Sequence, residues 1–173
     1  MLLREPGLLE RSFAFHASYL QTAPAPGVRV DLLERSPENS RPQRAMKVWL
    51  SLQAFGRDGY TAMIEYNIQL AAYMEELVQA TPGLALAAPR ELSIVCWRVE
   101  PGGVEGDALE EMQSRVIADL ERRGIAMVSN ARLRDGRTAL RACITNFRTR
   151  PEDIEAIVRS SAEIGERLVA SGT

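Results

Sequence analysis

The chain contains a single lysine, Lys47, among 21 lysine and arginine side chains. A lysine amine can form a Schiff base with a carbonyl compound when a pocket desolvates it or a cofactor holds it. Lys47 lies one residue after Met46 and two before Trp49, on the flank of an amphipathic, helix-forming stretch. A lysine in that setting lays its methylene groups on apolar neighbours and keeps its ammonium in water. We therefore interpret Lys47 as a structural helix residue.

The other side chains support little unaided chemistry. His16 is the only histidine, and we interpret it as a structural or surface residue rather than a catalytic one. Cys96 and Cys143 lie in apolar runs typical of strands, which favours buried, reduced thiols over a disulfide or a reactive thiol. Metal ligands do not occur at ligand spacing, and the sequence has neither a Gly-rich phosphate loop nor a nucleophile elbow.

The composition predicts one ordinary globular domain, or a small domain with an appendage. Of the 173 residues, 46% are hydrophobic and 25% are charged. The net charge of −2 argues against a nucleic-acid or membrane partner, since either would favour a basic excess. No signal peptide or membrane-spanning run is found, so we expect a cytoplasmic protein. The apolar start at Leu2 and Leu3 is what we expect of a segment of a longer protein.

The first half of the chain predicts a loop, two helices and a strand pair. The stretch 24–42 is rich in Pro, Ser and charge, and it predicts a long loop. Residues 43–55 predict a helix that stops at Gly56, and apolar residues at helical spacing predict a second helix from Tyr60 to Val78. The runs 84–88 and 92–99 predict neighbouring antiparallel strands.

The second half predicts two helices around a hairpin. Asp107 and Glu110 form a capping pattern before apolar residues at helical spacing. The runs 125–133 and 138–145 flank an Asp-Gly turn, which is a strong hairpin signal. Thr149 forms a capping box before the final helix. The whole order predicts an α/β or α+β fold with a small, mostly antiparallel sheet and helices packed on one face.

Three blocks of the sequence together resemble a known family. They are "PENSRPQRAMKVWLSLQAFGRDGY", "LSIVCWRVEPGG" and "LRACITNFRTRPEDI". With the opening "LLERSFAFHASYL", they resemble the C-terminal part of the group II pyridoxal-phosphate-dependent decarboxylases, the relatives of the aromatic-L-amino-acid, tryptophan, histidine and glutamate decarboxylases. The resemblance covers essentially the whole chain and implies the C-terminal small domain of a fold type I enzyme that works as a homodimer.

The resemblance also says which cofactor and loop residues to expect. The family's Schiff-base lysine belongs to a His-Lys dipeptide that would fall before Met1, whereas Lys47 matches a helix lysine of the Arg-x-x-Lys-x-Trp block. Pyridoxal phosphate would therefore be bound through an N-terminal part. Many members carry a tyrosine on a mobile loop that assists protonation, and Leu32 occupies the matching position. Leucine cannot donate a proton, although such a loop can still exclude water.

The resemblance makes Arg141 a candidate substrate-binding residue. Arg141 matches the arginine of the family's C-terminal strand, and in fold type I enzymes an arginine from this region often contacts a substrate carboxylate. A plain salt bridge on the sheet surface is an equally open alternative. Arg41 and Arg44 begin a helix whose dipole does not favour cations there, so we expect them to anchor the loop or a partner subunit.

Two hypotheses of function follow. We expect 1–40 to hold the end of the large domain and the mobile catalytic loop, 41–80 the connecting helices and 81–173 the small domain. The first hypothesis is the C-terminal part of a decarboxylase of aromatic L-amino acids, inactive without its N-terminal cofactor-binding half. Its partners would be that half, a second subunit and a small amino-acid substrate. The alternative is a stand-alone, non-catalytic dimerisation or regulatory module of the same fold; a truncated gene relic is a third possibility.

Overall fold

A computed structural model describes residues 4–5, 7–14, 35–38 and 42–171, and the chain divides into two compact units. The units are Met1–Ala54 and Phe55–Thr173, so the division falls within the predicted connecting helices. The first unit contains α1 (Leu8–Phe13), a short helix that no sequence pattern predicted. It also contains the start of α2 (Arg44–Ala80), whose remainder belongs to the second unit.

Helix α2 combines the two helices expected from the sequence. Gly56 interrupts it with φ 62° and ψ −176°, a left-handed φ that favours glycine. This break confirms the predicted stop. After it, an apolar stripe that includes Leu70, Met74 and Val78 is buried. None of the described helices is both long and apolar enough to cross a membrane.

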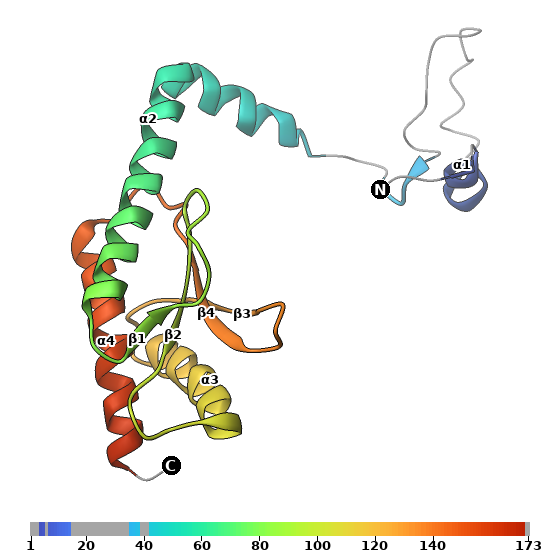
Figure 1. Ribbon diagram of the computed structural model, residues 1–173. Helices are drawn as coiled ribbons and strands as arrows, with labels where there is room; N and C mark the ends of the chain where they lie inside the picture. Colours follow the sequence, from blue (N-terminus) through green and yellow to red (C-terminus); the bar gives the residue numbers. More distant parts are fainter. Residues whose placement is uncertain (1–3, 6, 15–34, 39–41, 172–173) are drawn as a thin grey trace, which may run out of the picture. The chain divides into compact units, whose positions relative to one another are not determined.

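A four-stranded antiparallel sheet forms the centre of the second unit (Figure 1). Its order is β1 (Leu84–Leu86), β2 (Ile94–Val99), β4 (Thr138–Cys143) and β3 (Ser129–Arg132). Both predicted pairings, β1 with β2 and β3 with β4, are confirmed. The strands are shorter than predicted, and β2 begins only at Ile94 because Leu92 takes a φ of 51°, outside the β region.

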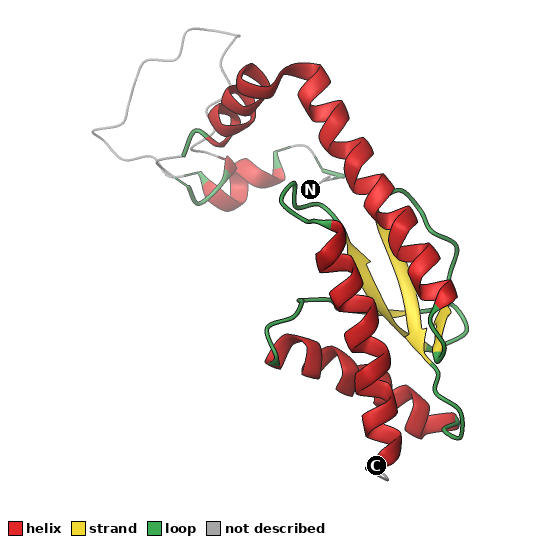
Figure 2. Cartoon of the chain, turned by 90° about the vertical axis from the view of Figure 1, so that its left-hand side faces the viewer, coloured by secondary structure: helices red, strands yellow, loops and turns green. Residues whose placement is uncertain are grey.

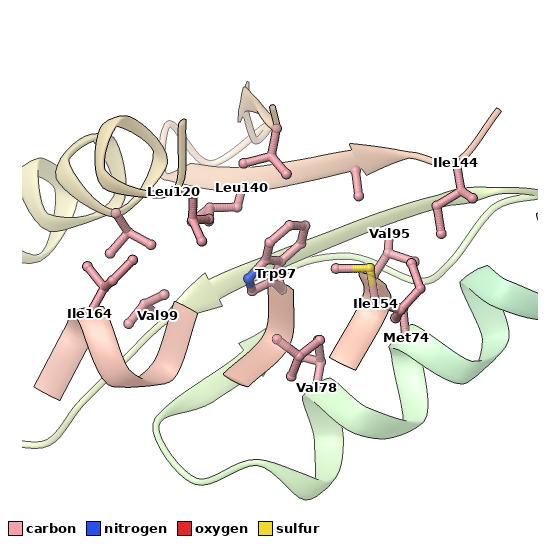
Figure 3. Packing of buried hydrophobic residues seen from close by; sticks show 14 of the residues in the cluster. Met74, Val78, Val95, Trp97, Val99, Leu120, Leu140, Ile144, Ile154 and Ile164 are labelled. Carbon is pink, nitrogen blue, oxygen red and sulfur yellow. The ribbon is translucent and has the colours of Figure 1, made fainter. Parts of the chain in front are cut away.

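Three helices cover one face of this sheet (Figure 2). They are the second part of α2, α3 (Gly106–Arg122) and α4 (Pro151–Ala170). Alternate residues of β2 and β4 meet the apolar stripes of these helices in a single core (Figure 3). The fully buried members include Met74, Val95, Trp97, Val116, Leu120, Leu140 and Ile164. The predicted class, a mostly antiparallel sheet with helices on one face, is confirmed.

Helices α3 and α4 both make close contacts with the end of β2. A Cβ at Gly165 of α4 would clash with the side chain of Val99, so glycine permits the close approach. The buried Gln113 of α3 accepts a hydrogen bond from the Val99 N–H (2.9 Å) and donates one to the Val99 carbonyl (2.8 Å). The pairing of β2 with β4 ends at Trp97, so β4 does not bond the N–H and carbonyl of Val99. Gln113 bonds both groups instead, which fixes α3 at the end of β2.

The caps predicted for α3 and α4 are both wrong. Glu105 occupies the N-cap of α3 without a side-chain hydrogen bond, because Glu110 is engaged elsewhere, as described below. The N-cap of α4 is Arg150, one residue later than predicted, and its N–H donates to the Asp153 carboxylate at 2.9 Å. Thr149 therefore lies outside the capping interaction.

Candidate functional site

Within the described residues, the helices cover only one face of the sheet. Successive strand residues point to opposite faces, so Trp97 of β2 faces the core and its neighbour Cys96 faces away. Arg141 of β4 lies opposite Cys96 and also opposite Ser129 of β3. We call this side of the sheet the uncovered face, and its partly or fully exposed residues include Ile94, Cys96, Ser129, Arg141 and Cys143.

Arg141, the candidate substrate-binding residue, is half-buried on the uncovered face. Its guanidinium forms no hydrogen bond or ion pair with any residue that the structure describes. A surface salt bridge, the alternative left open by the sequence, therefore finds no partner in that part of the chain. The five N–H donors of an unpaired arginine suit a planar carboxylate. Substrate binding by Arg141 stays a prediction.

Both cysteines belong to the uncovered face and are free thiols. Cys96 is half-buried, and burial raises the pKa of its thiol, although the positive charge of Arg141 partly opposes this. The thiol therefore stays protonated near neutral pH, which does not favour a nucleophile. Cys143 is exposed, so the prediction of a buried thiol is wrong there. The reason is that the last residue of β4 points away from the helices.

A buried charged cluster closes one end of the uncovered face. Arg98 of β2 is only 1% exposed, and its guanidinium donates to Glu110 of α3 (2.9 Å), to Glu100 (2.8 Å) and to the Thr138 carbonyl. The Glu110 carboxylate also accepts the Thr138 N–H at 2.5 Å. No sequence pattern predicted this cluster. The available signal was an arginine inside an apolar strand, because a buried charge requires partners.

The remaining candidates lie in the first unit. Lys47 is exposed on α2 and makes no hydrogen bond or ion pair with the residues described. An open depression of about 690 Å³ near it is lined by residues such as Glu38, Arg44 and Trp49, but not by Lys47. Arg44 pairs with Glu38 of the preceding segment at 2.9 Å.

Across the described ranges, no three His, Cys, Asp or Glu side chains are grouped so that they could hold a metal ion.

Three residues singled out from the sequence lie outside the described residues. They are His16, Leu32 at the expected loop-tyrosine position, and Arg41. Their predicted roles therefore stay predictions.

Comparisons with known proteins point to one family. The family model described as the pyridoxal-dependent decarboxylase conserved domain matches residues 1–100. An aromatic-L-amino-acid decarboxylase from Bacillus atrophaeus is 27% identical over 173 residues, covering 99% of this chain and 36% of that protein. A histidine decarboxylase from Drosophila melanogaster is 31% identical over 152 residues, covering 88% of this chain and 17% of that protein. The chain thus spans about a third, or less, of the length of these relatives.

A solved structure shows the same fold. The crystal structure of Catharanthus roseus tryptophan decarboxylase in complex with L-tryptophan is similar over 80% of this chain and 29% of that chain. The TM-score is 0.67 and the sequence identity is 22%. At this identity the likeness concerns the fold alone, and it confirms the small-domain fold that the sequence resemblance implied.

Proposed function

Because the chain belongs to the pyridoxal-dependent decarboxylase family, we propose that it forms the C-terminal part of an amino-acid decarboxylase. The family match over residues 1–100 is the observation that carries this proposal. The cofactor of the family is pyridoxal phosphate. We propose aromatic L-amino acids as substrates, in line with the name of the Bacillus atrophaeus relative. The reaction removes the α-carboxylate as CO2.

The described residues do not fit pyridoxal phosphate by themselves. Lys47, the only amine-bearing side chain of the sequence, is exposed on a helix and does not line the depression near it. When bound, the cofactor supplies the electron sink for the loss of CO2. We therefore propose that it is bound by a cofactor-binding part of the decarboxylase outside this chain. Without that part the chain should be inactive.

The chain would contribute substrate binding through Arg141. Its guanidinium, which has no hydrogen-bond partner among the described residues, would hold the substrate carboxylate by two parallel N–H···O hydrogen bonds. Such a contact fixes the orientation of the substrate. We also propose, from the family resemblance, that the complete enzyme is a homodimer. We further propose that it is located in the cytoplasm.

The experiment is to co-express this chain with the cofactor-binding part of the Bacillus atrophaeus decarboxylase, that is, its sequence outside the matched segment. We expect CO2 release from aromatic L-amino acids by the complex and none by the purified chain alone. Decarboxylation by the chain alone would contradict the proposal. A complex without activity would favour the non-catalytic module instead.

The role of Arg141 is tested in the same complex. Lysine cannot offer the planar pair of donors, so Arg141→Lys should raise KM for the amino acid by about tenfold or more, which corresponds to about 1.4 kcal/mol of lost binding. Arg134→Lys is the matched control, because Arg134 is exposed in the turn between β3 and β4, away from the uncovered face. Equal kinetics for the two variants would remove Arg141 from the substrate site.

A further inference from the structure

The three most exposed large hydrophobic side chains of the described residues come from three separate places in the sequence. Met127 is 88% exposed, Leu92 is 72% exposed and Phe147 is 61% exposed. We call these three residues the apolar tip. Single exposed apolar residues are common on protein surfaces, but a group of them marks an interaction site.

The strand register brings the apolar tip to one end of the sheet. Ile94 at the start of β2 pairs with Cys143 at the end of β4. Ser129 at the start of β3 pairs with Arg141, two residues before that end. Leu92 lies two residues before Ile94, Met127 two residues before Ser129 and Phe147 four residues after Cys143, where the chain enters β2, enters β3 and leaves β4.

Backbone contacts order the segments that carry two members of the tip, Leu92 and Phe147. Leu92 is the only non-glycine residue with positive φ among the described residues, at 51°. The Ile144 N–H donates to the Ser93 carbonyl at 2.9 Å, which joins the segments before β2 and after β4. The Asn146 side chain accepts the Arg148 N–H at 3.0 Å and orders the turn that carries Phe147. The Leu92 side chain is mostly in solvent although its backbone is strained, and such strain is typical of functional sites.

One member of the tip, Met127, continues the uncovered face. Counting back two residues from Ser129 gives Met127. Val128 lies between Met127 and Ser129, points to the opposite side and is buried in the core at 9% exposure. Met127 thus extends the same side of the sheet that carries Arg141, whereas Leu92 lies in the turn that leads into β2.

We propose that the apolar tip is the docking surface for the cofactor-binding part of the decarboxylase. This inference rests on the proposed function. The chain matches only 36% of the Bacillus atrophaeus relative with 99% of its own length, which leaves about two thirds of that protein outside the match. For Arg141 to meet a substrate beside the cofactor, that part must approach the uncovered face. The Arg98–Glu110 cluster closes one end of the face, so the open end with the tip is where it docks.

The first test is a footprint of the full chain by mild peroxide oxidation of its methionines. Met127 is 88% exposed, whereas Met74 and Met112 are 0% and 2% exposed and serve as internal controls. In the complex with the cofactor-binding part of the Bacillus atrophaeus enzyme, Met127 oxidation should slow by about tenfold, because docking removes the side chain from solvent. The buried methionines should not change their rate.

The second test replaces the tip. The combined variant Leu92→Ser, Met127→Ser and Phe147→Ser should reduce co-purification with the cofactor-binding part by about tenfold or more. Its isolated melting temperature should match that of the parent chain, because the three side chains are exposed. Val169→Ser, at an exposed apolar position on α4, is the matched control and should retain the complex.

Three results would overturn the docking proposal: failure of any complex to form, equal complex formation by the serine variant, or protection of Met127 in the chain alone as its concentration rises. The last would identify a second copy as the occupant. A tip-dependent complex that releases no CO2 contradicts the proposed function but supports the docking surface. An active complex in which Met127 stays reactive supports the function but contradicts the docking surface.

Discussion

Neighbouring residues of the same strand have opposite surroundings on the two faces of the sheet. Val95 and Trp97 are fully buried beneath the helices, whereas Cys96 between them is only half-buried. In β4 the buried Leu140 is followed by Arg141, which has no partner among the described residues. The difference shows that the covered face contains the apolar core, whereas the uncovered face carries side chains that have no partner among the described residues.

The uncovered face itself differs between its two ends. At one end Arg98 donates hydrogen bonds to Glu110 of α3 and to the carbonyl of Thr138, the first residue of β4. Its charge is therefore buried and paired. At the other end Leu92, Met127 and Phe147 remain in solvent. The closed end therefore belongs to the stability of the chain, and the open end is where we expect association. The following predictions test both contrasts.

The largest expected effect is at the centre of the covered face. Trp97→Ala should lower the free energy of unfolding by about 3–5 kcal/mol, because it removes a fully buried indole and leaves a cavity. Cys96→Ala, its neighbour on the other face, should cost less than about 1 kcal/mol. Urea unfolding followed by far-UV circular dichroism measures both. Similar losses would contradict the contrast between the two faces.

Glu110→Gln should come next, because it leaves the Arg98 guanidinium and the Thr138 N–H with a weaker acceptor. Breaking a buried ion pair costs about 3–5 kcal/mol, and we expect the lower end of this range because the Glu110 side chain is 33% exposed. Glu111→Gln, the exposed neighbour on α3, should be nearly neutral. If the two variants unfold at the same urea concentration, the cluster does not stabilise the chain.

The same glutamate predicts a pH dependence. Partial burial raises the pKa of Glu110, but the hydrogen bonds from Thr138 and Arg98 outweigh it and hold the pKa below its ordinary value of 4.5. A lowered pKa in the folded state stabilises the protein above the ordinary value, and this contribution is lost as the pH falls through the folded-state pKa. The stability difference between the parent chain and Glu110→Gln should therefore shrink on acidification below about pH 4.5. A difference that stays constant between pH 7 and pH 3 would refute this role.

Gly165→Ala should have a smaller effect on the contact of α4 with β2. The added methyl clashes with Val99, and such overpacking costs about 1–2 kcal/mol. Adding Val99→Ala should cost less in this background than in the parent chain, because the space it frees receives the new methyl. Thermal unfolding of the two single variants and the double variant measures this coupling. Strict additivity would show that α4 can shift to accommodate the methyl.

The smallest effect is expected at Lys47. Lys47→Ala should change the free energy of unfolding by less than about 0.5 kcal/mol, because the side chain is exposed and makes no bond to the described residues. Mixing the purified chain with pyridoxal phosphate should give no Schiff-base absorbance band, with or without this substitution. A strong band that Lys47→Ala abolishes would make Lys47 a reactive amine.

Much of the fold could be predicted from short stretches of the sequence. The hairpin around Asp135 and Gly136, the break at Gly56 and the pairing of β1 with β2 are all confirmed. The errors concern ends of elements. Thr149 and Glu110 have the residue types of caps, but the competing partners of Glu110 come from β2 and β4, which no local pattern reveals.

For the candidate site, the sequence singled out Arg141 but neither Arg98 nor the apolar tip. The sequence by itself determined the alternation of strand residues, the helical apolar stripes and the turns, because each depends on neighbours a few positions away. Only the tertiary structure decided which face the helices cover, that Arg98 is buried, and that Leu92, Met127 and Phe147 share one end of the sheet. These facts depend on strand register and on contacts between residues far apart in the chain, where the free energy of packing selects one arrangement among many that local preferences allow.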